Sequence, residues 1–125
     1  MSKELAINLS LSFLKGGAQL NTNASPSITV AGSNYTKQTV TVGTGDATVG
    51  LGSVGTPGYV LVRNLDSVNY ISLSTDGSTY PVPLQVKAGE LALLRWQSAA
   101  IHAKANTASC LVEFTIVEAY VEVEV

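Results

Sequence analysis

The chain has 125 residues, a length that fits one domain burying roughly two thirds of its unfolded surface. Only 13% of the residues are charged and 46% are hydrophobic, whereas soluble domains usually contain roughly 25% charged residues. This composition predicts either a large core or apolar surface that other subunits cover, and we favour the second.

The net charge is −2, and the seven basic residues are scattered without a cluster. Nucleic-acid binding needs a basic patch that neutralises phosphates, so we expect no nucleic-acid partner. The first residues are interrupted by polar side chains at alternate positions, which is not typical of a signal peptide or a membrane-spanning segment. We therefore also expect no membrane partner. The basic residues are Lys3, Lys15, Lys37, Arg63, Lys87, Arg95 and Lys104.

The clearest strand lies near the start of the chain, where residues 5–13 read "LAINLSLSF". Large apolar residues alternate with small or polar ones, as in a strand with one covered face. The next stretch, 14–27, is rich in Gly and Asn and predicts a loop. Residues 28–30 and 35–42 are rich in β-branched side chains and flank the turn signal "AGSN", so they predict a hairpin.

Residues 43–58, "GTGDATVGLGSVGTPG", contain a glycine or proline every few positions. We expect a surface loop, in which "ATVGL" could add a short strand. Gly50, Gly52 and Gly55 formally match the phosphate-binding pattern G-x-G-x-x-G. That mechanism needs a helix directly after the glycines, and Pro57 and Gly58 exclude one, so a flexible loop is the preferred interpretation.

The second half predicts short strands at regular spacing, separated by turns. "TDGS" at 75–78 is a tight-hairpin signal, and "KAGE" at 87–90 is a second. Residues 90–103 contain many good helix formers, so a helix is the main alternative there. We favour two strands joined at "QSAA", because the apolar residues do not keep a helical spacing. The expected strands are "YVLVRN", "YISLST", "YPVPLQV", "LALLRW", "IHAKA" and "CLVEFTIV".

The chain ends in "AYVEVEV", which alternates to the last residue. Residues 110–125 can form one long run that bends or bulges near Glu118. The final strand either pairs inside the same domain, for example with residues 5–13, or reaches a neighbouring subunit, where the two glutamates discourage uncontrolled edge pairing. The candidate subunit-interface residues are Tyr120, Val121, Val123 and Val125.

Together these patterns predict an all-β protein: a single antiparallel β-sandwich domain over residues 1–125, jelly-roll-like in class.

No arrangement of residues predicts catalysis. His102 is the one histidine, and no nucleophile motif or paired acids accompany it, so we expect neither a catalytic triad nor a histidine metal site. A calcium site from Asn64, Asp66 and Asp76 is a weaker alternative without a recognised loop pattern. We expect Cys110 to be buried and inert. The prediction is a protein without catalytic residues, cofactor or metal.

Residues 58–119 resemble a family of small structural proteins of tailed bacteriophages. The resemblance is carried by "RNLDSVNYISLS", by "YPVPLQVKAGE" leading into "LALLRW", and by "IHAKANTASCLVEFTIVEA". It implies a β-sandwich that decorates or cements a capsid, or that belongs to the tail apparatus.

The expected function is therefore a non-enzymatic virion protein, a head decoration or cement protein assembled in the bacterial cytoplasm. We expect a homo-oligomer, with a trimer favoured, that binds the major capsid protein or other virion proteins. The alternative is a tail fibre, spike or neck component that binds host glycans through its loops 14–27 and 43–58 and exposed tyrosines.

Overall fold

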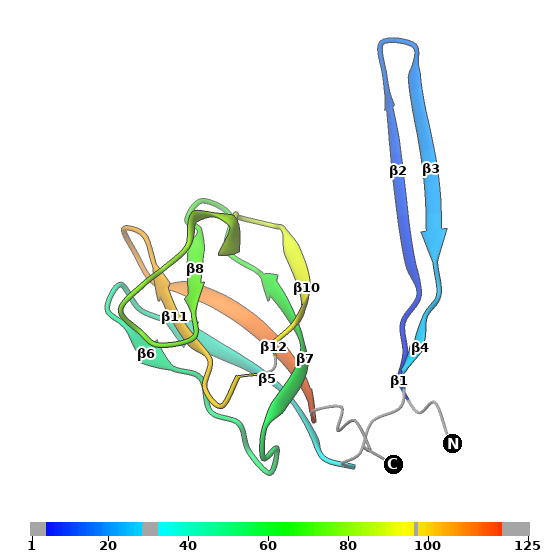
Figure 1. The fold of residues 1–125 in the computed structure, drawn as a ribbon. Coiled ribbons are helices and arrows are strands. Elements are labelled where there is room, and N and C mark those ends of the chain that lie inside the picture. Colours follow the sequence, from blue (N-terminus) through cyan, green and yellow to red (C-terminus); the bar gives the residue numbers. More distant parts are fainter. Residues whose placement is uncertain (1–4, 29–32, 97, 119–125) are drawn as a thin grey trace. The chain divides into compact units, whose positions relative to one another are not determined.

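The computed structural model describes residues 5–28, 33–96 and 98–118. The described chain is all-β, and its strands pair antiparallel (Figure 1). It divides into two compact units, residues 5–28 and residues 33–118. The first unit is a β-hairpin, and the second contains the two larger sheets. The strands predicted at "YVLVRN", "YISLST", "LALLRW", "IHAKA" and "CLVEFTIV" lie in the second unit. The strand predicted at "YPVPLQV" is wrong over most of its length, because a 3₁₀ turn at Val82–Leu84 precedes a two-residue strand at Gln85–Val86. The strand predicted at "AYVEVEV" lies outside the described residues.

The second unit, called the sandwich unit below, has two four-stranded sheets, ordered β10-β7-β12-β5 and β6-β11-β8-β9. In the first sheet, β12 lies between β5 and β7 and pairs with both over nearly its whole length. The strands are β5 (Tyr35–Val42), β6 (Ala47–Thr48), β7 (Pro57–Asn64), β8 (Ile71–Ser74), β9 (Gln85–Val86), β10 (Leu91–Arg95), β11 (His102–Ala105) and β12 (Cys110–Glu118).

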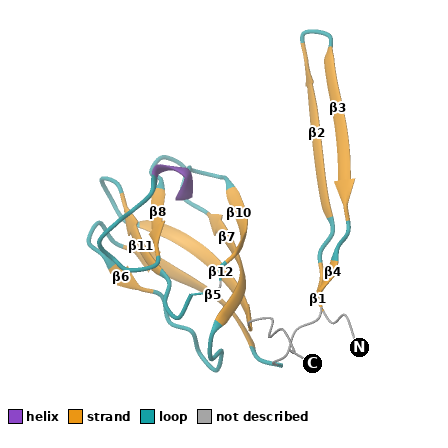
Figure 2. Cartoon of the chain, viewed as in Figure 1, coloured by secondary structure: helices purple, strands orange, loops and turns teal. Residues whose placement is uncertain are grey.

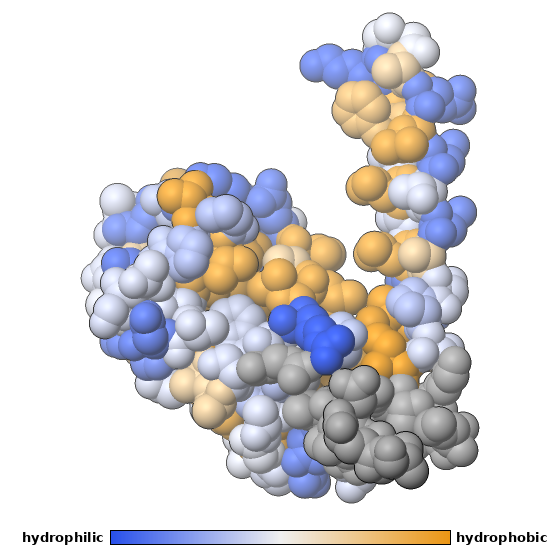
Figure 3. All heavy atoms as spheres, in the orientation of Figure 1, coloured by the Kyte–Doolittle hydropathy of each residue, from blue (hydrophilic) through white to orange (hydrophobic). Residues whose placement is uncertain are grey.

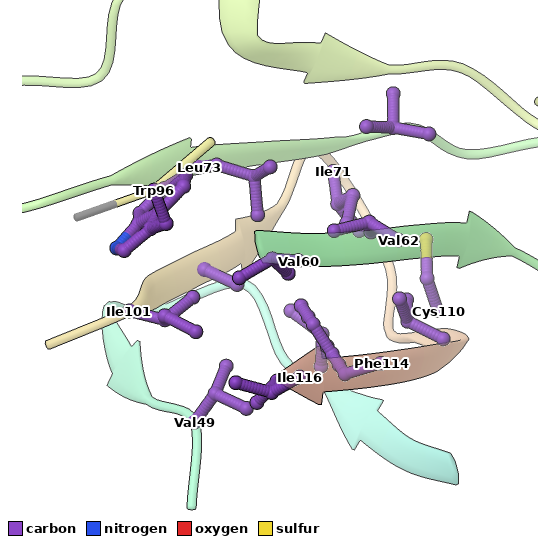
Figure 4. Packing of buried hydrophobic residues seen from close by; sticks show 14 of the residues in the cluster. Val49, Val60, Val62, Ile71, Leu73, Trp96, Ile101, Cys110, Phe114 and Ile116 are labelled. Carbon is purple, nitrogen blue, oxygen red and sulfur yellow. The ribbon is translucent and has the colours of Figure 1, made fainter. Parts of the chain in front are cut away.

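The core lies between these two sheets and takes residues from both (Figure 4). Alternate residues of β12 are fully or almost fully buried, and the intervening residues are at least partly exposed. Because successive side chains of a strand point to opposite faces, this pattern makes one face of β12 part of the core. The largest fully buried side chains are Phe114, Ile71, Leu73, Ile101 and Ile116.

Residues 90–105 form two strands, as predicted, and not the alternative helix. β10 and β11 belong to different sheets, and the indole of Trp96 helps to fix the connection between them. Its Nε1–H donates to the carbonyl of Ala100 at 2.8 Å, and its backbone N–H donates to Gly58. In the described part of the chain, the one helical element is a 3₁₀ turn, η1 (Val82–Leu84), coloured purple in Figure 2.

The predicted bulge near Glu118 is present. The register between β12 and β7 shifts between Val117 and Glu118. The predicted loop at 43–58 is also present, with the short strand β6 inside it, and the strand β7 follows the glycine pattern directly.

The hairpin unit corrects the prediction of a loop at 14–27. β2 (Leu9–Lys15) pairs in full register with β3 (Ala18–Ala24), and β1 (Leu5–Ala6) pairs with β4 (Ser27–Ile28). Gly16 and Gly17 form the two-residue turn at positive φ, 56° and 88°. Such a turn suits a tight hairpin because glycine adopts positive φ without steric cost. The β2–β3 pair is called the ribbon below.

Three predicted hairpins have different partners. Residues 35–42 pair with β12, and Ile28 pairs with Leu5, so they do not form the hairpin expected around "AGSN". The turn at 75–78 exists, but β8 pairs with β9 after the longer excursion through η1. The turn at 87–90 joins strands of different sheets. For residues 35–42, pairing with the distant strand β12 places Val42 in the core.

A core substitution tests which face of β12 carries the stability. Phe114 is fully buried, while Leu111 on the same strand is 47% exposed. Phe114→Ala leaves a cavity, so we expect it to lower the free energy of unfolding by about 3–5 kcal/mol. Leu111→Ala should change it by about 0.5 kcal/mol or less. Urea denaturation measures both values, and equal losses would show that the face assignment is wrong.

Candidate interaction surfaces

The predicted interface residues Tyr120, Val121, Val123 and Val125 lie outside the described residues. Their role stays a prediction, as does the pairing of the final strand. The candidate surfaces described next come from other parts of the chain.

The ribbon exposes an apolar face. Every residue of β2 and β3 is exposed, including Leu11 at 56% and Phe13 at 51%. Figure 3 shows hydrophobic residues along one side of the ribbon and hydrophilic residues along the other. A two-stranded hairpin is marginally stable at best on its own, so this apolar face is a candidate interaction surface.

The outer face of the sheet β10-β7-β12-β5 is a second candidate. Leu93 lies opposite Leu61 in the register, and Arg63 lies opposite Glu113. The guanidinium of Arg63 contacts the carboxylate of Glu113 at 3.0 Å, so these two charges are compensated on the surface itself. This face combines exposed leucines with internally paired charge, which suits a subunit contact.

The tyrosines are less available for stacking on a sugar ring than the sequence suggests. Lys87 Nζ lies 4.0 Å from the ring centroid of Tyr70, and Lys104 Nζ lies 4.3 Å from that of Tyr80. A cation over the ring stabilises that arrangement and occupies one ring face. Tyr35 is 69% exposed and is the better candidate for an external contact.

A polar cluster joins two loops to β11. Asp46 accepts a hydrogen bond from the hydroxyl of Tyr80, and its Oδ1 lies 3.2 Å from Nδ1 of His102. A carboxylate cannot donate, so this contact places a proton on Nδ1 of the histidine. Burial, followed by the hydrogen bond and the charge of Asp46, raises the pKa of Tyr80, which keeps its hydroxyl a donor. The members of this cluster are far apart in the chain, so no sequence pattern predicts it.

The contacts of the cluster hold two loops against β11. Ser74 lies opposite His102 in the register, but it is fully buried and its hydroxyl donates to Asp76. It therefore does not form a nucleophile–base pair with the histidine. His102 is partly buried on β11, a strand that is paired on both sides, by β6 and by β8.

The acids proposed as calcium ligands are engaged with their own turns. Asp66 accepts the backbone N–H groups of Val68 and Asn69, and Asp76 accepts those of Ser78 and Thr79. These bonds lower the pKa of both carboxyl groups. Within residues 5–28, 33–96 and 98–118, no three His, Cys, Asp or Glu side chains are grouped to hold a metal ion.

Asn64 has a structural role in the same region. Its side-chain amide is buried and donates to the carbonyls of Asn69 and Val86, while its oxygen accepts the N–H of Asp66. Every polar atom of this side chain is therefore satisfied inside the protein, which secures the turn after β7.

Glu118 anchors the end of β12. Its carboxylate accepts the backbone N–H of Gly55 at 3.0 Å and both the backbone and side-chain N–H groups of Asn34 at 3.2 Å. The bonds from Gly55, and then those from Asn34, lower the pKa of Glu118. This carboxylate ties the glycine loop and the start of β5 to β12.

Cys110 is buried, as predicted. Burial, with a smaller contribution from the charge of Asp66, raises the pKa of its thiol, which disfavours the reactive thiolate. No helix in the described part of the chain is long and apolar enough to cross a membrane.

Comparison with known proteins gives no further guidance, because no protein-family model, curated protein or solved structure matches the chain.

Gly77 tests the packing of the polar cluster. Its φ is +79°, and an added Cβ would lie 2.9 Å from Asp46 Oδ2 and from His102 Nδ1. Gly89 has a similar φ of +76° but open space around it. Gly89→Ala therefore adds backbone strain alone, which costs about 1 kcal/mol. We expect Gly77→Ala to cost clearly more in thermal or urea unfolding, and equal losses would contradict the close packing.

Glu118 makes a pH-dependent contribution with a defined sign. Its pKa is lowered in the folded state, so its stabilisation is present above its ordinary pKa of 4.5 and is lost as the pH falls through the lower folded value. At neutral pH we expect Glu118→Gln to speed hydrogen exchange at the amides of Gly55 and Asn34, whereas Glu113→Gln should leave them unchanged. The difference between wild type and Glu118→Gln should shrink on acidification, and a difference that grows would refute the assignment.

Proposed function

We propose that the protein is a non-enzymatic structural component of a tailed-bacteriophage virion, a decoration or cement protein of the head. It is assembled in the host cytoplasm and binds the major capsid protein or other virion proteins as a homo-oligomer, with a trimer favoured. The observation that carries the proposal is the exposed, nearly uncharged apolar face of the ribbon. Such a surface is suited to burial against other subunits.

Three further features support this proposal. The segments that carry the resemblance to phage structural proteins contain the end of β7 and the strands β8 to β12. Two four-stranded sheets around one core agree with the jelly-roll-like fold that we propose, and jelly rolls are common in viral capsid proteins. The low fraction of charged residues, 13%, suits a protein that buries surface between subunits.

The mechanism of a cement protein is mass action. A protein that binds the assembled shell and not its dissociated subunits shifts the equilibrium towards the shell. At a free concentration about one hundred times the Kd, one such site contributes about 2.7 kcal/mol. No chemical step is required, which agrees with a polar cluster whose contacts hold loops in place.

The alternative is a tail fibre, spike or neck component that binds host glycans. The exposed ring of Tyr35 and the glycine-rich loop 43–58 favour it. Two observations weaken this alternative. Residues 15–24 of the predicted binding loop belong to the ribbon. The rings of Tyr70 and Tyr80 are each covered on one face by a lysine ammonium group.

Co-sedimentation with capsid shells tests the proposal. We expect purified protein to bind mature shells in a saturable manner and to raise the temperature at which they dissociate. Shells already saturated with the protein are the control and should take up no more. Absence of binding to shells, with binding to isolated tails or a signal on a glycan array, would contradict the head assignment and favour the alternative.

A further inference from the structure

The ribbon has two chemically distinct faces, which follow from its register. Residues directly opposite each other in an antiparallel pair point to the same face. One face therefore carries the pairs Leu9 with Ala24, Leu11 with Thr22, and Phe13 with Leu20. The other face carries Ser10, Ser12 and Leu14 on β2 with Asn23, Asn21 and Gln19 on β3.

The apolar face has a relief that complements itself. Its three large residues on β2 form a ridge: Leu9, Leu11 and Phe13. On β3, two of the three opposite positions carry the smaller side chains of Ala24 and Thr22, from which we infer a shallow channel beside the ridge. A ridge beside a channel can pack against an identical surface, because the ridge of each copy fits the channel of the other.

The charge on this face agrees with self-association. From Leu9 to Leu14 and from Ala18 to Ala24 the ribbon has no charged residue. Lys15, which lies opposite Ala18 beside the turn, is the one charged residue on the apolar face of the ribbon. Burying the part of the face between Leu9 and Leu14 against a copy of itself therefore desolvates no unpaired charge. A partner that recognises its target by charge complementarity would have no charged side chain to pair with between Leu9 and Leu14 or between Ala18 and Ala24.

We propose that the apolar face of the ribbon packs against the same face of a second copy of this chain. This inference rests on the homo-oligomer that we propose above and names the surface that joins its subunits. The two ribbons lie face to face about 10 Å apart, the usual spacing of packed sheets. The serine and asparagine faces stay in water. Because each copy offers the same face to the other, this contact has two-fold symmetry.

Matched substitutions on the two faces of β2 test this inference. The double variant Leu11→Asn, Phe13→Asn removes the centre of the ridge, and Ser10→Asn, Ser12→Asn places the same residues on the opposite face. Both add two asparagines to β2, although the ridge variant also removes Phe13, which favours strands more than serine does. Sedimentation velocity over a concentration series gives the mass, and the fluorescence of Trp96 reports whether the sandwich unit is folded.

We expect the wild type and the serine-face variant to be oligomers, and the ridge variant to be a folded monomer whose association is weakened at least tenfold. A monomeric wild type, or a ridge variant with the wild-type mass, would overturn the inference. A ridge variant that keeps its mass but no longer binds shells would show that the ribbon contacts the capsid protein, which overturns the inference and supports the proposed function. Oligomers that depend on the ridge but bind no shell would support the inference and contradict the proposed function.

A cross-linking experiment locates the contact directly. Leu11→Cys chains are mixed with Thr22→Cys chains and oxidised, so that a disulfide between the two kinds of chain joins ridge to channel. The control mixes Ser12→Cys with Asn21→Cys, an opposite pair on the polar face. Cys110 is buried and does not compete. We expect mixed covalent dimers from the first pair only, and equal yields from both pairs would overturn the inference.

Discussion

The sandwich unit depends on the burial of one face of β12. This strand is paired on both sides, by β5 and by β7, so its backbone hydrogen bonds are made within the sheet and its side chains determine which face is covered. Val112, Phe114 and Ile116 are fully buried and meet Ile71 and Leu73 of the opposite sheet within one cluster. Because a shift by one residue would expose all of them, the register of β12 is fixed by hydrophobic burial.

Local hydrogen bonds then fix the loops on this core. Four polar side chains bind backbone N–H or carbonyl groups of nearby turns or adjoining loops: those of Asn64, Asp66, Asp76 and Glu118. The side chain of Asp46 connects a loop to β11. These polar side chains are therefore occupied by the protein itself. The apolar surface exposed on the ribbon and on the outer face of the first sheet has no comparable internal partner among the described residues. This contrast is one reason why we propose that the protein acts through subunit contacts.

The sequence alone predicted those strands in which the spacing of the apolar residues matches the spacing of the buried residues. The alternation in residues 110–118 and the broken helical spacing in residues 90–105 both predicted the observed elements. The strand Ala18–Ala24 was missed because its Gln, Asn and Thr side chains have weak strand preference, and pairing with β2 determines its conformation. The two-residue turn Gly16-Gly17 was the signal that could have found it.

Partners distant in the chain were not predictable from the sequence. The sequence of residues 35–42 predicts a local hairpin, yet these residues pair with β12. Which strands meet is determined by packing in the core, and the local sequence does not specify it. Asp46, Tyr80 and His102 likewise meet through the positions of β6, β11 and the loop after β8, and no spacing rule connects them. The exposed leucines of β2 were visible in the sequence, but the identity of the apolar face became clear only with its partner strand.

The most direct test of the proposed role is a cryo-electron microscopy map of the intact particle that carries this protein. We predict density for the sandwich unit at repeated lattice positions of the head shell, with ribbons of neighbouring copies in contact. Density restricted to the tail or to the unique vertex would contradict the assignment to the head.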